Sequence, residues 1–222
     1  MNTELLTFAL TTLTGFIAIM NPIATSTNFI AIVAGRSKAS KLRIAKKSCI
    51  TAFIITVTFT LIGKWIFQLF GITIPAFKIT GGIMMFWIGF EMLMFQRSKI
   101  QSQTNNNGGN NDNDSADLKS MEEDNDIAIT PIAIPILAGP GTLVAAMNSV
   151  TEGTTIHTII AIIVFTFMII ITYFSFIGAD RIVSRLGSNM IKVISKIMGL
   201  ILAIIGTGMI ITGIKMAIDM PL

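Results

Sequence analysis

Long apolar stretches alternate with short charged segments along the whole chain. The first stretch, Leu5–Val33, contains no Lys, Arg, Asp or Glu. A helix of about 20 apolar residues crosses the hydrocarbon core of a bilayer, which is about 30 Å thick. The pattern therefore predicts an all-α polytopic membrane protein with six transmembrane helices, at Leu5–Val33, Ser48–Phe70, Ala76–Phe95, Ile127–Val150, Ile156–Ile177 and Val193–Ala217.

Two of these stretches contain residues that interrupt a helix. In the first, Pro22 has no N–H to donate, and Asn21 before it is disfavoured in the α conformation. In the fourth, Gly139, Pro140 and Gly141 stand together, and this sequence is a poor continuous helix. Lipid cannot satisfy the freed backbone groups, so such breaks occur inside protein or beside a water-filled cavity. We therefore predict that helices 1 and 4 are broken, and that the breaks form a binding site from backbone atoms.

A polar segment, Gln101–Asp126, separates two groups of three helices. It is rich in Asn and then in Asp and Glu, a composition that cannot bury enough apolar surface to order itself. We predict a disordered cytoplasmic linker over 101–126, between a first three-helix repeat (1–100) and a second (127–222). An acidic cation-binding loop is the alternative, but the segment lacks the regular oxygen spacing of an EF-hand.

The two halves carry matched features. Pro22 falls on Pro140 when the first helices are aligned, and alignment of the third helices matches Gly82 with Gly199 and Gly89 with Gly206. Because three crossings are an odd number, the second half enters from the opposite face of the membrane, which predicts inverted repeats. The glycines on one face of the last helix are expected to let it pack closely against another helix.

Basic residues gather between the predicted helices. Six Lys and Arg residues lie in Gly35–Lys47, and Ala179–Lys192 is also basic. Such an excess marks cytoplasmic loops, so we predict a multi-pass plasma-membrane protein with both termini outside. The net charge of +4 follows from this orientation signal and requires no nucleic-acid partner.

The chain offers little catalytic chemistry. It has one histidine, His157, and one cysteine, Cys49, and it carries no Ser-His-Asp, zinc, P-loop or dinucleotide motif. We therefore expect no enzyme activity, no catalytic residue, no metal and no cofactor. Cys49 is expected to pack as a small apolar residue, and His157 to lie at the surface.

A broken helix suits a zwitterionic ligand. It presents N–H groups at the start of one half and C=O groups at the end of the other, with opposite partial charges. Two such breaks at the membrane midplane are common in secondary transporters; the alternative is that Pro and Gly only kink helices for packing. The predicted substrate site comprises Asn21, Pro22, Ile23, Ala24 and Thr25 from the first break, and Ala138, Gly139, Pro140, Gly141 and Thr142 from the second.

The predicted helices and their ends carry a few isolated charges. Glu91, near the inner end of helix 3, is a candidate for ion coupling, although a Glu in this position can also reach the interface. Lys64 and Lys78 flank an outer turn and are expected to extend to the lipid headgroups. Rival functions are a non-transporting scaffold or regulatory subunit, and a channel, which would need a more continuous polar lining than helices 2, 5 and 6 provide.

Two motifs resemble those of a known family. Asn21-Pro22-Ile23 is similar to the Asn-Pro-Ile signature of the MarC family of integral membrane proteins, and Pro131 to Gly141 resembles that family's Pro-Leu-Ala-Ile-Pro-Leu-Ile-Ala-Gly-Pro-Gly stretch. The length of the chain, its six predicted helices and its polar mid-chain linker also agree with that family. Ala24 departs from the family, in which Gly is common at this position, and the Asn-rich linker is peculiar to this chain.

The resemblance implies an amino-acid transporter. The family includes an archaeal transporter of small neutral amino acids such as glycine and alanine, driven by an ion gradient, and other members have been linked to drug resistance. By this resemblance the chain is expected to bind a small neutral amino acid with H⁺ or Na⁺ as coupling ion, within the lipid bilayer. Export of other small solutes or drugs is the alternative, and the oligomeric state is left open.

Overall fold

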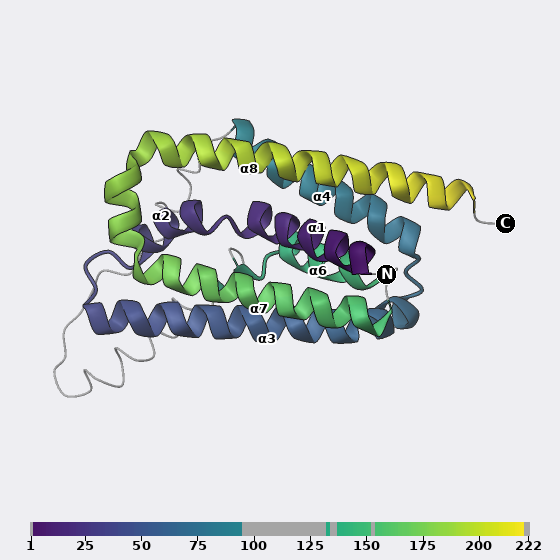
Figure 1. Ribbon diagram of the computed structural model, residues 1–222, viewed down its shortest axis with the longest axis horizontal. Helices are drawn as coiled ribbons and strands as arrows, with labels where there is room; N and C mark the ends of the chain where they lie inside the picture. The colour runs from purple at the N-terminus through teal and green to yellow at the C-terminus, as the bar shows by residue number, and fades with distance from the viewer. Residues whose placement is uncertain (1, 95–131, 134–136, 152–153, 220–222) are drawn as a thin grey trace.

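The computed structural model describes residues 2–94, 132–133, 137–151 and 154–219. Its regular structure in these ranges is entirely helical (Figure 1), which confirms the all-α prediction. The helices are α1 (Asn2–Met20), α2 (Pro22–Ile32), α3 (Lys38–Phe70), α4 (Ile74–Met94), α6 (Pro140–Thr151), α7 (Thr155–Ile177) and α8 (Ala179–Ile218).

The described residues contain five spans that are long and apolar enough to cross a membrane, at Thr3–Ile32, Lys38–Gly63, Ile74–Met94, Thr155–Ile177 and Asn189–Ile218. The predicted span Ile127–Val150 lies partly outside the described residues. Its described helix, α6, has 12 residues and is too short to cross alone. The count of six helices therefore stays a prediction, and the predicted linker 101–126 lies outside the described residues.

The helices pack in three layers (Figure 1). In one outer layer α4 lies against α8, in the other α3 lies against α7, and α1, α2 and α6 lie between them. The middle layer therefore contains both predicted helix breaks. Its freed backbone groups meet protein above and below, as irregular backbone at membrane depth requires.

Glycines set the close contact between α4 and α8. A Cβ on Gly206 would lie 2.5 Å from the Phe86 nitrogen and 2.6 Å from the Gly82 oxygen, and one on Gly89 would lie 2.5 Å from the Gly199 oxygen. Only hydrogen fits at such distances, so the two backbones touch directly. The expected packing role of these glycines is confirmed.

Both basic segments that were predicted as loops are mostly helical, so the predicted boundaries are wrong there. α3 already begins at Lys38, after Ser37, whose hydroxyl accepts a hydrogen bond from the Ser40 N–H at 3.2 Å. Residues 179–192 belong to α8, which is kinked at Gly187 (φ 69°, ψ 161°), so a short helix before the kink joins the long helix after it (Figure 1). Lys and Arg are good helix formers, so a charged segment outside the membrane can prolong a helix. At about 50 Å, α3 is longer than the hydrocarbon core is thick.

Lys78 does not extend to the headgroups, which corrects that prediction. Its side chain is buried, only 5% exposed, in α4. It lies one turn before Gly82, on the buried face of α4 that also carries Met85 and Gly89. The helical period therefore turns Lys78 inward, whereas its distance from the helix end suggested an outward position. The side chain of Lys64 is outside the described part of the structure.

Candidate functional site

The first break is a single left-handed residue between α1 and α2. Asn21 has φ 38° and ψ 71°, a conformation in which Asn is one of the few common non-glycine residues. Its N–H donates to the Ile17 oxygen at 2.9 Å, and its side-chain oxygen accepts from the Ala24 N–H at 3.3 Å. Pro22 occupies the first position of α2 and has no N–H to offer the Ala18 oxygen. The break therefore leaves C=O groups at the end of α1.

Hydroxyl groups hold the start of α2 against α7. The Pro22 oxygen accepts hydrogen bonds from the Ser26 hydroxyl at 2.7 Å and the Ser175 hydroxyl at 3.0 Å, and the two hydroxyl oxygens lie 2.7 Å apart. The Thr25 hydroxyl donates to the Asn21 and Pro22 oxygens, at 3.1 and 3.2 Å. The hydroxyl hydrogen of Thr25 is thus used within the break. Toward a ligand, this hydroxyl can only accept a hydrogen bond.

Ser175 was missed by the sequence analysis. It lies on α7, and no motif marks it. One signal was present: Thr172 and Ser175 stand three residues apart in a very apolar helix, which places two hydroxyls on one face. Both are buried, so this face of α7 turns to the protein interior.

The hydroxyl of Ser175 should stabilise the contact between α2 and α7. We expect Ser175→Ala to lower the free energy of unfolding by about 1 kcal/mol, since bonds to the Pro22 and Ser26 oxygens are lost. Ser195→Ala is the matched control because that hydroxyl donates to the Ile191 oxygen of its own helix. Unfolding of the purified protein in mixed micelles measures both, and an equal loss in the two variants would contradict the role of Ser175.

The second break lies before α6. The Ala138 N–H donates to the Ala133 oxygen at 2.7 Å, one residue wider than an α-helical bond, and the Leu143 N–H donates to the Gly139 oxygen at 3.1 Å, which opens α6. Pro140 again takes the first helical position. The N–H groups of Gly141 and Thr142 fall in the first turn, where a helix provides no acceptor for them. They form the positive end of the α6 dipole.

The two breaks lie close together in the middle layer. A Cβ on Gly141 would lie 3.5 Å from Ile19 Cγ2, two residues before Asn21, and 3.1 Å from Ile88 Cδ1 of α4. Asn21, Ala138 and Thr142 are buried, while other predicted site residues differ: Ile23 and Ala24 are half-buried and Pro140 is exposed. The start of α6 therefore faces the end of α1 inside the protein.

Polar atoms without partners mark this region. Within the described residues, the Asn21 side-chain nitrogen and the Thr142 hydroxyl are buried and make no hydrogen bond, and the same holds for the Thr56 hydroxyl on α3, a helix that packs on α6. A buried polar group without a partner costs about 1–3 kcal/mol, so native proteins retain few of them. One such group stands in each break, which is typical of a surface that meets a polar ligand.

The structure does not join Glu91 to the two breaks in the part of the chain that it describes. It is half-buried, three residues before the end of α4, and the structure gives its carboxylate no bond to either break within the described residues. Its role in ion coupling stays a prediction.

Comparison of the sequence with known proteins identifies a family. A model described as MarC family integral membrane protein matches residues 6–218. A membrane protein of Pyrococcus horikoshii is 38% identical over 91% of this chain and 92% of its own length. The membrane protein YvbG of Bacillus subtilis is 35% identical over 89% and 90%, and an inner membrane protein MarC of Escherichia coli is 28% identical over 87% and 88%. No solved structure matches the chain.

Proposed function

Because the chain belongs to the MarC family of integral membrane proteins, we propose that it is a secondary transporter of a small neutral amino acid, such as glycine or alanine, across the plasma membrane. The observation that carries the proposal is the approach of two broken helices, each with a proline at its restart and a buried polar group without a partner. The protein is then not an enzyme, and it uses an H⁺ or Na⁺ gradient, with Glu91 as the candidate coupling group.

The ends of the broken helices match the two charges of a zwitterion. The N–H groups of Gly141 and Thr142 suit a carboxylate, because a helix start is an anion site. The carbonyls at the end of α1, among them that of Ala18, suit an ammonium group. The side chains of Asn21 and Thr142 add a donor and a hydroxyl. Because Ile19 and Ile88 pack closely around Gly141, we expect the site to accept a small side chain only.

Reciprocal contacts support two inverted three-helix repeats around this site. α3 packs on α6 as α7 packs on α2, and α4 packs on α8. Gly82 meets Gly206, and Gly89 meets Gly199. Since Gly82 aligns with Gly199 and Gly89 with Gly206, exchanging the halves turns the first contact into the second. A pseudo-two-fold axis in the membrane plane has this property.

Uptake by proteoliposomes tests the proposal. The purified protein should accumulate labelled alanine when a proton or sodium gradient is imposed, and alanine or glycine should raise its melting temperature because a ligand of the folded state stabilises it. Leucine and lysine, which are larger or charged, should do neither. A scaffold would show no thermal shift with any amino acid. A channel would conduct without accumulation, and either result would refute the proposal.

The orientation of the molecule is tested by labelling. The start of α3 and the start of α8 lie at the same end of the bundle, opposite the start of α1 and the end of α8 (Figure 1). Both starts are basic, so we expect this end to face the cytoplasm. A cysteine at Lys41, in a Cys49→Ala background, should be labelled by a membrane-impermeant maleimide only after the cells are permeabilised. Efficient labelling of intact cells would reverse the orientation.

A further inference from the structure

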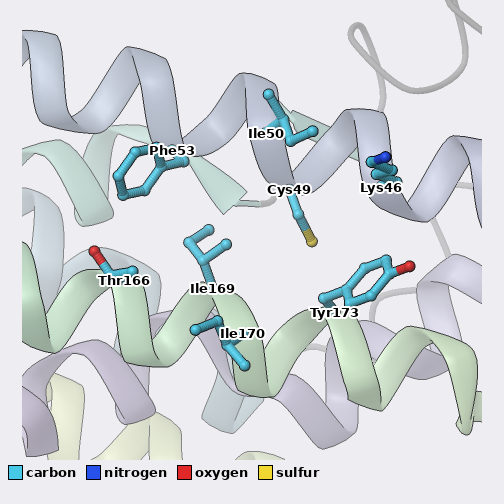
Figure 2. A pocket seen from close by; sticks show the side chains of 8 residues that line it. All are labelled: Lys46, Cys49, Ile50, Phe53, Thr166, Ile169, Ile170 and Tyr173. Carbon is cyan, nitrogen blue, oxygen red and sulfur yellow. The ribbon is translucent and has the colours of Figure 1, made fainter.

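A groove lies between α3 and α7 in the outer layer, away from the helix breaks. One wall is the face of α3 from Lys46 to Phe53, the other the face of α7 from Thr166 to Tyr173, and the volume is about 370 Å³ (Figure 2). Ile50 and Ile170, each about half exposed, border it, so the groove is open on the surface that the lipid covers. It follows the two helices for about two turns, roughly 10 Å.

The charged group of the groove and its phenolic hydroxyl are at one end. Lys46 and Tyr173 lie at the same end of the groove, on opposite walls, whereas the Phe53 ring and Thr166 lie at the other end (Figure 2). The Thr166 hydroxyl donates to the Ile162 oxygen of its own helix at 2.7 Å, so this end presents mainly carbon. The groove therefore has the polarity of an amphipathic molecule, with a charged head and an apolar tail.

The polar end is positive and available. α3 and α7 contain no Asp or Glu, and α3 carries further Lys and Arg residues in its first turns. Among the described residues, the structure gives the Lys46 ammonium and the Tyr173 hydroxyl no hydrogen bond or ion pair. A cation and a hydroxyl at the same end of a groove are suited to an anionic group such as a phosphate, which has several oxygens to accept from both.

The depth of the groove fits a lipid. Tyr173 lies one turn before α7 ends at Ile177, which is where tyrosines of membrane proteins meet the headgroups. From there the groove extends toward the middle of the span, where acyl chains lie. The end that bears Lys46 is also the basic end of the bundle, at which anionic lipids of the cytoplasmic leaflet accumulate.

We propose that this groove is a binding site for an anionic phospholipid of the surrounding bilayer. The phosphate contacts Lys46 and Tyr173, and an acyl chain lies along Ile170 toward Phe53. A zwitterionic phospholipid would bring a second cation toward Lys46 and binds less tightly. A second copy of this chain would set its own basic α3 against the first and is disfavoured by charge.

Native mass spectrometry of the delipidated protein tests this site. Titration with phosphatidylglycerol and with phosphatidylcholine of the same acyl chains should show one tightly bound phosphatidylglycerol, preferred about fivefold to tenfold. Lys46→Gln should reduce that preference to less than about twofold. Lys38→Gln removes the same charge from the exposed first turn of α3, outside the groove, and should leave the preference unchanged.

A second variant tests the apolar end without touching charge. Thr166→Phe fills the end of the groove that Phe53 borders. It should weaken the binding of both lipids equally, so the preference between them persists. The proposal is overturned if Lys46→Gln and Lys38→Gln show the same preference between the two lipids, or if Thr166→Phe binds both lipids as the parent does. It is also overturned if the parent forms a dimer and binds no lipid, and Thr166→Phe dissociates that dimer. Unchanged melting temperatures of the variants without lipid show that folding is intact.

Discussion

Gly141→Val is expected to abolish alanine uptake in a protein that still folds. A Cβ at this position would lie 3.1 Å from Ile88 Cδ1, the end of a flexible side chain that can move aside, and 3.5 Å from Ile19 Cγ2, an ordinary van der Waals contact. The two further methyl groups then occupy the space between the start of α6 and the end of α1. The methyl groups should keep the alanine carboxylate from at least one N–H group at the start of α6. Loss of one hydrogen bond to a charged group is worth about 1.5–3 kcal/mol, so alanine affinity should fall at least about tenfold to a hundredfold.

The control for this variant is Gly15→Val. Gly15 lies on α1, before the break, and a Cβ there meets no atom within 4 Å, so uptake should persist. Melting temperatures with and without alanine separate loss of binding from loss of folding: Gly141→Val should melt as a folded protein but gain nothing from alanine. If it takes up alanine as the parent does, the substrate site is elsewhere and the breaks serve only packing.

Among the variants proposed here, Gly206→Ala is expected to lower the free energy of unfolding the most. The added methyl carbon would lie 2.5 Å from the Phe86 nitrogen and 2.6 Å from the Gly82 oxygen, and these are backbone atoms that cannot move without separating α4 from α8. We expect a loss of about 3 kcal/mol, at the upper end of overpacking effects, and a melting temperature lower by roughly 5–10 °C.

Gly208→Ala provides the matched control two residues along the same helix. A Cβ at Gly208 meets no atom within 4 Å, so this variant should be neutral or slightly more stable, since Ala favours a helix over Gly. The comparison removes the effect of helix propensity because both variants make the same chemical change. Equal melting temperatures of the two variants would contradict the direct backbone contact.

The helix breaks were predictable because their causes are local. Pro22 and Pro140 lack a donor whatever surrounds them, and Asn21 and Gly139 adjoin them in the sequence. The close-packed glycines were predictable because their spacing repeats on one helical face. What this local chemistry predicts is where the chain departs from a helix and where two helices can approach.

Features that depend on tertiary packing were not predictable in the same way. Ser175 acts on the Pro22 oxygen from a helix far along the chain, and nothing in its neighbouring residues indicates this. Lys78 lies inward because α4 turns its glycine face to α8, whereas its position near a helix end suggested the opposite. The basic segment Gly35–Lys47 was assigned to a loop by charge, although charge reports the side of the membrane and not the conformation of the backbone.

The three-layer arrangement restricts how the molecule can change shape. Direct backbone contact at Gly82, Gly89 and Gly206 joins α4 tightly to α8, so we expect this pair to move as one body. Apart from the short connections from α3 to α4 and from α7 to α8, the α3–α7 pair contacts it chiefly through α1, α2 and α6. We expect the middle layer to absorb any sliding of one outer pair past the other, at Asn21 and Gly139, where helical hydrogen bonds are already missing. The residues that would hold the ligand would then also act as the hinges of the transport cycle.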